Sequence, residues 1–188
     1  GLRPENSNPC RRLRRFPETK RDRFLKPEEV ETLLGTLRVA ETEGLPWGGD
    51  PSRPYRKLAR RPENRRTMVP PPAADIVRVL LFTGCRLGEV LTLRWDAVDF
   101  AGRSLRIDRT KNGRPHVVAL TDPVEAILRR QPGPATSPWV FPKLSDPSRP
   151  FPKETMEQIW QRVRAAAGLE DVRLHDLRHT FGTWAGQT

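Results

Sequence analysis

The sequence predicts a mainly α-helical domain with a small antiparallel β-sheet, an α+β fold. Apolar residues recur with helical spacing along much of the chain, whereas residues 95–120 read as short strands and contain Asn112-Gly113, the strongest short hairpin signal. With 188 residues, 36% of them hydrophobic, the chain can bury one core. It contains no uninterrupted run of about 20 apolar residues, so we expect a soluble protein without a membrane span.

Helices are predicted where apolar residues share one helical face. Pro27 followed by Glu28 and Glu29 is typical of a helix start, because proline lacks an N–H that would go unpaired there and acids favour the positive end of the helix dipole. Thr121 is placed to cap a later helix. The predicted helices are 27–43, 73–82, 87–93, 121–130, 153–169 and a last one that begins close to residue 175.

The connecting segments are rich in proline, glycine and arginine. Residues 1–26 have the composition of a basic interdomain linker, so one domain is expected over residues 27–188. Residues 44–72 are predicted to form a long basic loop, whose length indicates an insertion. A further loop, residues 131–152, encloses the strand-like sequence Trp139-Val140-Phe141.

The charge and cysteine content narrow the class of protein. A net charge of +11 attracts polyanions, of which nucleic acid is the commonest in a cell, although a merely solubilising surface is the alternative. Cys10 and Cys85 belong to no CxxC or Cys/His cluster, which argues against a disulfide framework and a zinc site. We therefore expect a cytoplasmic, DNA-associated protein with no metal.

The last helix carries the most informative polar residues. His175 and Arg178 are three positions apart and point the same way, at the rim of an apolar stripe expected to face the core. Gly182 lies between them on that face, where a phosphate or a backbone has room to approach, and His179 is expected to play a supporting role. The stripe consists of Leu174, Leu177, Phe181 and Trp184. The alternative is an ordinary solvated helix edge.

Two further clusters are basic. Arg86 stands at a predicted helix start, where a guanidinium and free N–H groups together bind phosphate, and Glu89 one turn later is placed to hold it. A simple ion pair is the alternative. The expected hairpin tip carries Arg109, Lys111 and Arg114, which suit the groove or backbone of a duplex but are also typical of a solvated turn. The loop arginines Arg60, Arg61, Arg65 and Arg66 are further candidates for DNA binding.

Taken together, the three clusters resemble the tyrosine recombinase (phage integrase) family over about residues 24–188. The matching pattern is Thr-Gly-x-Arg-x-x-Glu from Thr83, a hairpin lysine at Lys111, and His-x-Leu-Arg-His from His175. The resemblance implies a catalytic domain in which Arg86 and Arg178 bind the scissile phosphate of double-stranded DNA. It implies that Lys111 is the general acid for the leaving 5′ oxygen and that His175 assists proton transfer.

The same resemblance implies site-specific DNA recombination or integration through a 3′-phosphotyrosyl intermediate, without a metal or nucleotide cofactor. It also implies that the protein belongs to a phage or other mobile element and that the full-length protein self-associates on DNA. The family's nucleophilic tyrosine lies after the His-x-x-Arg helix, whereas Tyr55 precedes every matching residue. We therefore expect a fragment that carries the phosphate site and no nucleophile. The alternatives are a non-catalytic DNA-binding or regulatory protein on this scaffold and a type IB topoisomerase.

Overall fold

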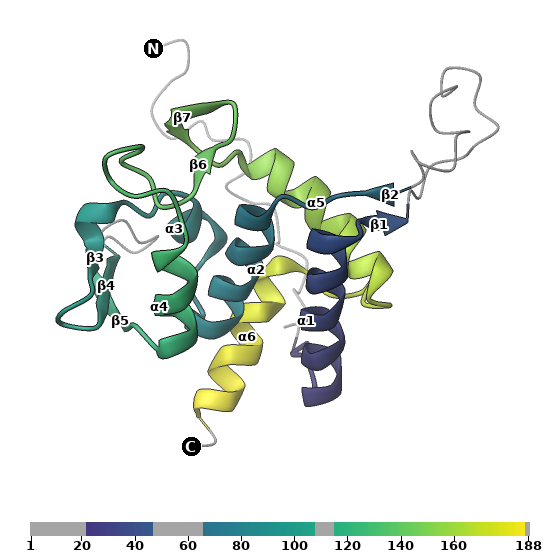
Figure 1. The fold of residues 1–188 in the computed structure, drawn as a ribbon. Helices are drawn as coiled ribbons and strands as arrows, with labels where there is room; N and C mark the ends of the chain where they lie inside the picture. Colours follow the sequence, from purple (N-terminus) through teal and green to yellow (C-terminus); the bar gives the residue numbers. More distant parts are fainter. Residues whose placement is uncertain (1–21, 47–65, 108–114, 187–188) are drawn as a thin grey trace, which may run out of the picture.

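The computed structural model describes residues 22–46, 66–107 and 115–186 and confirms the predicted α+β class (Figure 1). The described helices are α1 (Pro27–Thr42), α2 (Pro71–Thr83), α3 (Leu87–Leu91), α4 (Asp122–Arg129), α5 (Lys153–Ala166) and α6 (Leu174–Ala185), with a 3-10 turn η3 (Trp95–Ala97). The described strands are β1 (Leu45–Pro46), β2 (Arg66–Thr67), β3 (Val98–Asp99), β4 (Ser104–Ile107), β5 (His116–Ala119), β6 (Pro142–Lys143) and β7 (Asp146–Pro150).

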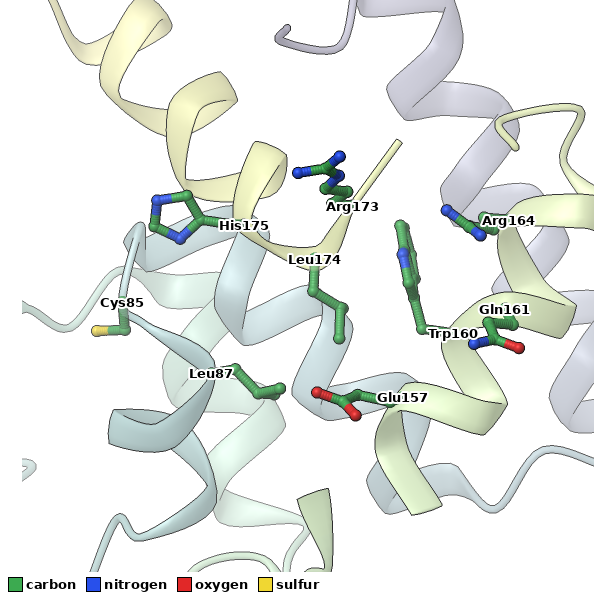
Figure 2. A pocket seen from close by; sticks show the side chains of 9 residues that line it. All are labelled: Cys85, Leu87, Glu157, Trp160, Gln161, Arg164, Arg173, Leu174 and His175. Carbon is green, nitrogen blue, oxygen red and sulfur yellow. The ribbon is translucent and has the colours of Figure 1, made fainter. Parts of the chain in front are cut away.

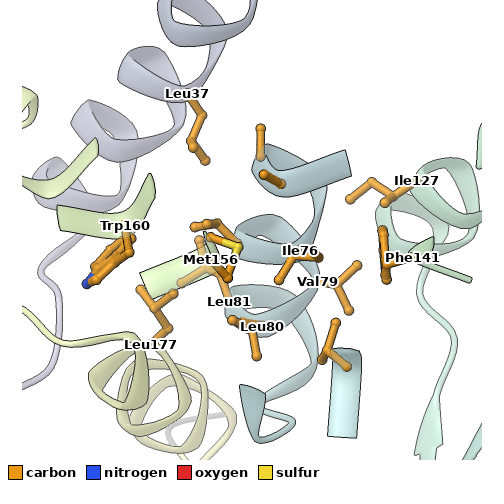
Figure 3. Packing of buried hydrophobic residues seen from close by; sticks show 14 of the residues in the cluster. Leu37, Ile76, Val79, Leu80, Leu81, Ile127, Phe141, Met156, Trp160 and Leu177 are labelled. Atoms are coloured by element: carbon orange, nitrogen blue, oxygen red, sulfur yellow. The ribbon is translucent and has the colours of Figure 1, made fainter. Parts of the chain in front are cut away.

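Helix α2 forms the centre of the core and contacts α1, α3, α4 and α6 (Figure 1). Its sequence is almost wholly apolar, and Ile76, Val77 and Val79 are fully buried. Figure 3 shows α2 side chains packed between Leu37 of α1, Ile127 of α4 and Leu177 of α6. In the described part of the chain, no helix is both long and apolar enough to cross a membrane.

The predicted sheet is present as the antiparallel order β3-β4-β5. Leu105 of β4 pairs with Val98 of β3 and with Val118 of β5. Leu105 and Ile107 are buried while Arg106 between them is exposed, so strand alternation gives this sheet one core face and one outer face. The turn that joins β4 to β5, which contains Lys111, lies outside the described residues.

Two short hairpins differ from the predictions. The ends of the predicted 44–72 loop pair as β1 and β2, with Leu45 opposite Thr67, and α2 begins at Pro71, before its predicted start at residue 73. The strand predicted at 139–141 is also displaced, because β6 begins at Pro142 and Trp139 makes only an isolated bridge to Arg94. These pairings depend on a partner strand, which a local pattern does not identify.

The predicted apolar stripe of α6 is only partly buried. Leu177 is fully buried, but Phe181 and Trp184 are 36% and 37% exposed, so the prediction was wrong for the outer half of the helix. These two rings line a shallow apolar groove with Phe82 of α2 and Pro123 of α4. The buried polar residues of α6 are instead Asp176 and Thr180.

Residues 22–26, here called the leading segment, precede α1 and pack on the domain. Leu25 is fully buried, and its backbone N–H donates a hydrogen bond to the Thr180 hydroxyl of α6. Leu25, one residue before the predicted boundary between linker and domain at residue 26, is therefore already part of the packed core.

Candidate phosphate-binding site

The site is built on the turn between α2 and α3. Helix α2 ends at Gly84, which has a left-handed φ of +62°, a conformation that favours glycine. A Cβ atom at Gly84 would also lie 2.5 Å from the Cδ1 atom of Phe181 in α6. Glycine is thus required for both the turn and the close approach of α6, and it brings the two halves of the sequence motif together.

Arg86 is the N-cap residue of α3 and is held by the buried Glu89. The Arg86 Nη1 atom donates to Glu89 Oε1 at 2.8 Å, and the Arg86 backbone N–H donates to Glu89 Oε2 at 2.7 Å. The Glu89 side chain is 4% exposed, whereas that of Arg86 is 35% exposed. The buried carboxylate therefore orients a guanidinium that still reaches solvent, the arrangement expected of a preorganised anion ligand.

Arg178 reaches the same turn from α6. Its Nη1 atom donates to the Gly84 carbonyl oxygen at 2.5 Å, two residues before Arg86. Cys85 lies between these two contact points and is buried, which raises the pKa of its thiol. The two arginines of the motif are 92 positions apart in the sequence, yet Arg178 contacts the turn to which Arg86 belongs.

His175 completes the cluster. Its ring lies 4.9 Å from that of His179, centroid to centroid and nearly perpendicular. His175 reaches solvent, but partial burial of its ring lowers its pKa. The positive charges of His179, Arg178 and Arg86 lower it further, against the opposing effect of Asp176. Both arginines are therefore close enough to act on this imidazole, which is mostly neutral near pH 7.

A pocket of about 360 Å³ lies next to His175. Figure 2 shows His175 and Cys85 on one side of it and Trp160, Glu157 and Gln161 of α5 on the other. Gly182, on the outer side of α6, has no atom within 4 Å of an added Cβ. Across the described ranges, no group of three or more His, Cys, Asp or Glu side chains is arranged to hold a metal ion.

The other predicted site residues fall elsewhere. Arg66 lies in β2, where its Nε atom donates to the backbone carbonyls of Glu43 and Gly44, so it has a structural role in that hairpin. Its contact with DNA stays a prediction. The remaining predicted residues, which lie outside the described ranges, are Arg60, Arg61, Arg65, Arg109, Lys111 and Arg114.

Sequence reasoning missed the residues that hold α6 in place. Asp176 accepts a hydrogen bond from the backbone N–H of Arg173 at 2.8 Å and so closes the start of α6, as Glu89 closes the start of α3. The signal was available, because both helices begin with arginine followed three residues later by an acid. Thr180 gave no such signal, since its partner is distant in sequence.

The helical core, the small sheet and the two-arginine turn define the class of the domain, and comparison with known proteins identifies it. The phage integrase family matches residues 56–186, and the chain belongs to this family. It is similar to the integrase of Salmonella phage P22, with 28% identity over 127 residues that cover 62% of this chain and 33% of the relative.

Two further comparisons agree. Tyrosine recombinase XerA of Saccharolobus solfataricus is 32% identical over 108 residues, which cover 57% of this chain and 34% of that protein. A lambda integrase dimer bound to a COC' core site has the same fold, with a TM-score of 0.58 and 13% identity over 88% of this chain and 53% of that one. The chain thus spans about a third of the length of the curated relatives it matches.

Proposed function

We propose that this chain carries the phosphate-binding part of the catalytic domain of a site-specific tyrosine recombinase, which breaks and rejoins duplex DNA. The observation that supports the proposal is that Arg178 contacts the Gly84 turn to which Arg86 belongs. The positive charges of both arginines lower the pKa of His175. Residues 27–188 would form this catalytic domain, and residues 1–26 its linker.

The arrangement suits transfer of a phosphoryl group between two oxygens. In the proposed step a tyrosine oxygen forms a bond to phosphorus as its proton leaves, and the bond to the 5′ oxygen breaks as that oxygen takes up a proton. Negative charge grows on the phosphate oxygens in the transition state, where fixed arginine forks stabilise it. Because the phosphoester energy is retained in the phosphotyrosine, the step needs no cofactor.

Each group has a role in this step. Arg86 and Arg178 would bind the scissile phosphate, while Glu89 holds Arg86 in its rotamer. Lys111 would protonate the leaving 5′ oxygen. His175, neutral because burial and nearby cations lower its pKa, is able to accept a proton, and an incoming phosphate would stabilise its charged form.

The proposed partner is double-stranded DNA, with which the protein would be associated in the cytoplasm. The net charge of +11 supports binding through the DNA backbone. The lambda integrase structure contains a dimer on its core site. We extend both properties, DNA binding and self-association on DNA in the full-length protein, to this chain as proposals.

A salt titration of DNA binding tests the proposal. The affinity for a short fluorescent duplex should fall with salt, with a log–log slope of about 0.9 for each phosphate neutralised. Arg86→Ala and Arg178→Ala should each weaken binding roughly tenfold and reduce that slope by about one. Arg38→Ala removes the same charge from an exposed position on α1 and is the matched control. Salt-independent binding, or equal effects of all three variants, would contradict the proposal.

A further inference from the structure

Helix α6 presents two different faces. His175 and His179 are exposed and Arg178 is half-buried, and these three belong to the candidate site. Asp176 and Thr180, one turn apart on the other face, are 2% and 0% exposed. A helix moves as a unit over so short a length, so whatever holds Thr180 also determines where Arg178 lies.

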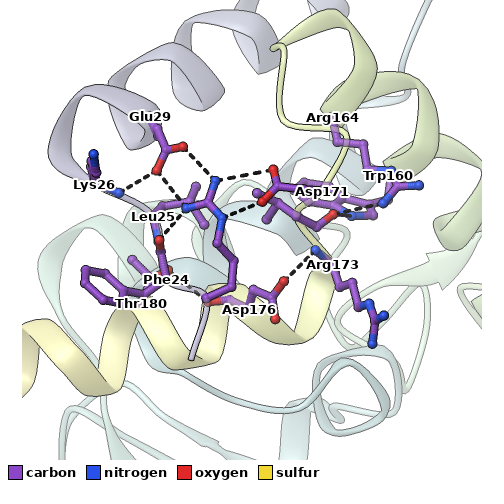
Figure 4. A network of polar contacts seen from close by, with 12 residues as sticks. Phe24, Leu25, Lys26, Glu29, Trp160, Arg164, Asp171, Arg173, Asp176 and Thr180 are labelled. Carbon is purple, nitrogen blue, oxygen red and sulfur yellow. Dashed lines mark hydrogen bonds and ion pairs between the residues drawn. The ribbon is translucent and has the colours of Figure 1, made fainter. Parts of the chain in front are cut away.

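A buried chain of hydrogen bonds connects the second face to the leading segment (Figure 4). The Leu25 backbone N–H donates to the Thr180 hydroxyl at 2.9 Å, and that hydroxyl donates to the Asp176 carbonyl oxygen at 2.9 Å. Leu25 and Thr180 are both fully buried, so water has no access to replace a lost bond. Among the residues that the structure describes, the Thr180 hydroxyl is therefore the hydrogen-bond partner of this amide.

Arg23 fastens the other end of the leading segment. Its guanidinium binds Glu29 of α1, with Nη2 to Oε1 at 2.6 Å, and Asp171 in the loop before α6, with Nε to Oδ2 at 2.7 Å. Glu29 also accepts the backbone N–H of Lys26 at 2.8 Å. The leading segment is thus tied both to the loop that enters α6 and to the helix itself.

We propose that the leading segment is part of the phosphate site's support, and that Thr180 is the positioning residue through which it sets the place of His175 and Arg178. The inference rests on the proposed function of that site. It makes DNA binding sensitive to residues 22–26, although none of them belongs to the sequence motif. A displacement of the leading segment would then also shift Arg178, because Thr180 connects the segment to α6.

The test compares Thr180→Val with Thr180→Ser. Valine keeps the shape and removes the hydroxyl, whereas serine keeps the hydroxyl, so only valine breaks the link to Leu25. Thr180→Val should raise the pKa of His175 toward its ordinary value, because a displaced α6 would hydrate His175 and move it away from the charge of Arg86. NMR titration of His175 measures the change. His179, Arg178, Asp176 and Arg86 are the charged and titratable groups that act on His175, and the substitution leaves all four in place. DNA affinity should fall roughly tenfold, as expected for residues in one hydrogen-bond network, and Thr180→Ser should restore both properties.

Ser137→Ala is the matched control. The Ser137 hydroxyl is also buried, accepts the Trp139 backbone N–H at 3.0 Å and donates to the Pro147 carbonyl at 2.7 Å, far from α6 in sequence. It should lower the unfolding midpoint like Thr180→Val and leave the His175 titration unchanged. If Thr180→Val also leaves that titration unchanged, Thr180 is only structural and the inference is wrong. If the titration changes but the unaltered chain binds no DNA, the positioning role stands and the proposed function fails.

Discussion

At the scale of single residues, Gly84 determines whether the two halves of the site can meet. It caps the end of α2 with a left-handed φ of +62°, and its carbonyl oxygen accepts a hydrogen bond from the Arg178 guanidinium. Because it has no side chain, it leaves room for Phe181. Few positions combine a conformational, a steric and a hydrogen-bonding requirement in this way. The requirement for glycine in the Thr-Gly-x-Arg pattern is therefore a packing requirement as well as a turn requirement.

Gly84→Ala should destabilise the domain by about 2–4 kcal/mol, because it adds the strain of a left-handed alanine to a steric overlap with Phe181. Urea unfolding measures the loss. Gly88→Ala is the control, since an added Cβ in that helical position meets nothing within 4 Å. It should be neutral or stabilising by up to about 1 kcal/mol. Equal effects at the two glycines would show that Phe181 simply moves aside.

His175 should make stability depend on pH. Because folding lowers its pKa, the unfolded chain binds more protons than the folded chain just below the ordinary histidine value of 6.5. The free energy of unfolding should therefore decrease as the pH falls through 6.5 and be unaffected by this group well above it. Thermal unfolding over a pH series measures the effect, and His175→Gln should flatten it. A slope that survives the substitution must come from another group.

At the scale of elements, a buried carboxylate ties α2 to its neighbours. Asp75 is 1% exposed and accepts hydrogen bonds from Arg78 at 2.9 Å, Arg130 at 2.8 Å and Gln131 at 2.7 Å. Arg78 in turn donates to Glu41 of α1 at 3.0 Å. The network joins α1, α2 and the end of α4, so it holds the central helix that presents the Gly84 turn.

Asp75→Asn should lower the free energy of unfolding by about 3 kcal/mol, because it removes the buried carboxylate that Arg78 and Arg130 share and leaves Arg78 with Glu41. Chemical denaturation measures the loss. Asp96→Asn provides the comparison, since Asp96 and its partner Arg94 are both largely exposed and such pairs contribute less than about 1 kcal/mol. A loss at Asp75 no greater than that at Asp96 would mean that water already reaches the network.

At the scale of the whole molecule, phosphate binding is separable from nucleophilic attack. Tyr55 is the one tyrosine of the sequence, lies outside the described residues, and precedes every residue of the motif. The described groups supply positive charge and a neutral imidazole, which in the proposed function would bind and stabilise a phosphate. Covalent capture additionally requires a tyrosine held in line with the leaving oxygen.

We therefore expect this chain, incubated with nicked suicide-type DNA, to form no covalent protein–DNA adduct on a denaturing gel. The salt-dependent binding measured on the same duplex is the positive control for a folded, DNA-competent sample. An adduct that disappears in Tyr55→Phe would overturn this expectation and assign the nucleophile to Tyr55.

The sequence by itself determined what depends on near neighbours. Helical spacing predicted α2 and α5, and the acid three residues after Arg86 predicted its ion pair. The Thr-Gly-x-Arg and His-x-x-Arg patterns predicted the residues of the candidate site. These features depend on residues within one or two helical turns of one another, so a short stretch of sequence is enough to predict them.

Only the tertiary structure decided which side of α6 is buried and what holds it. Apolar spacing predicted Leu177, Phe181 and Trp184 for the core, yet Leu177 is buried beside the polar residues Asp176 and Thr180. Thr180 can be buried because its partner is Leu25, 155 positions away. The pairing of Leu45 with Thr67 in β1 and β2 and the contact of Arg178 with Gly84 also join residues that no local pattern connects. A polar side chain is buried where a hydrogen-bond partner lies beside it, and the whole fold determines the position of that partner.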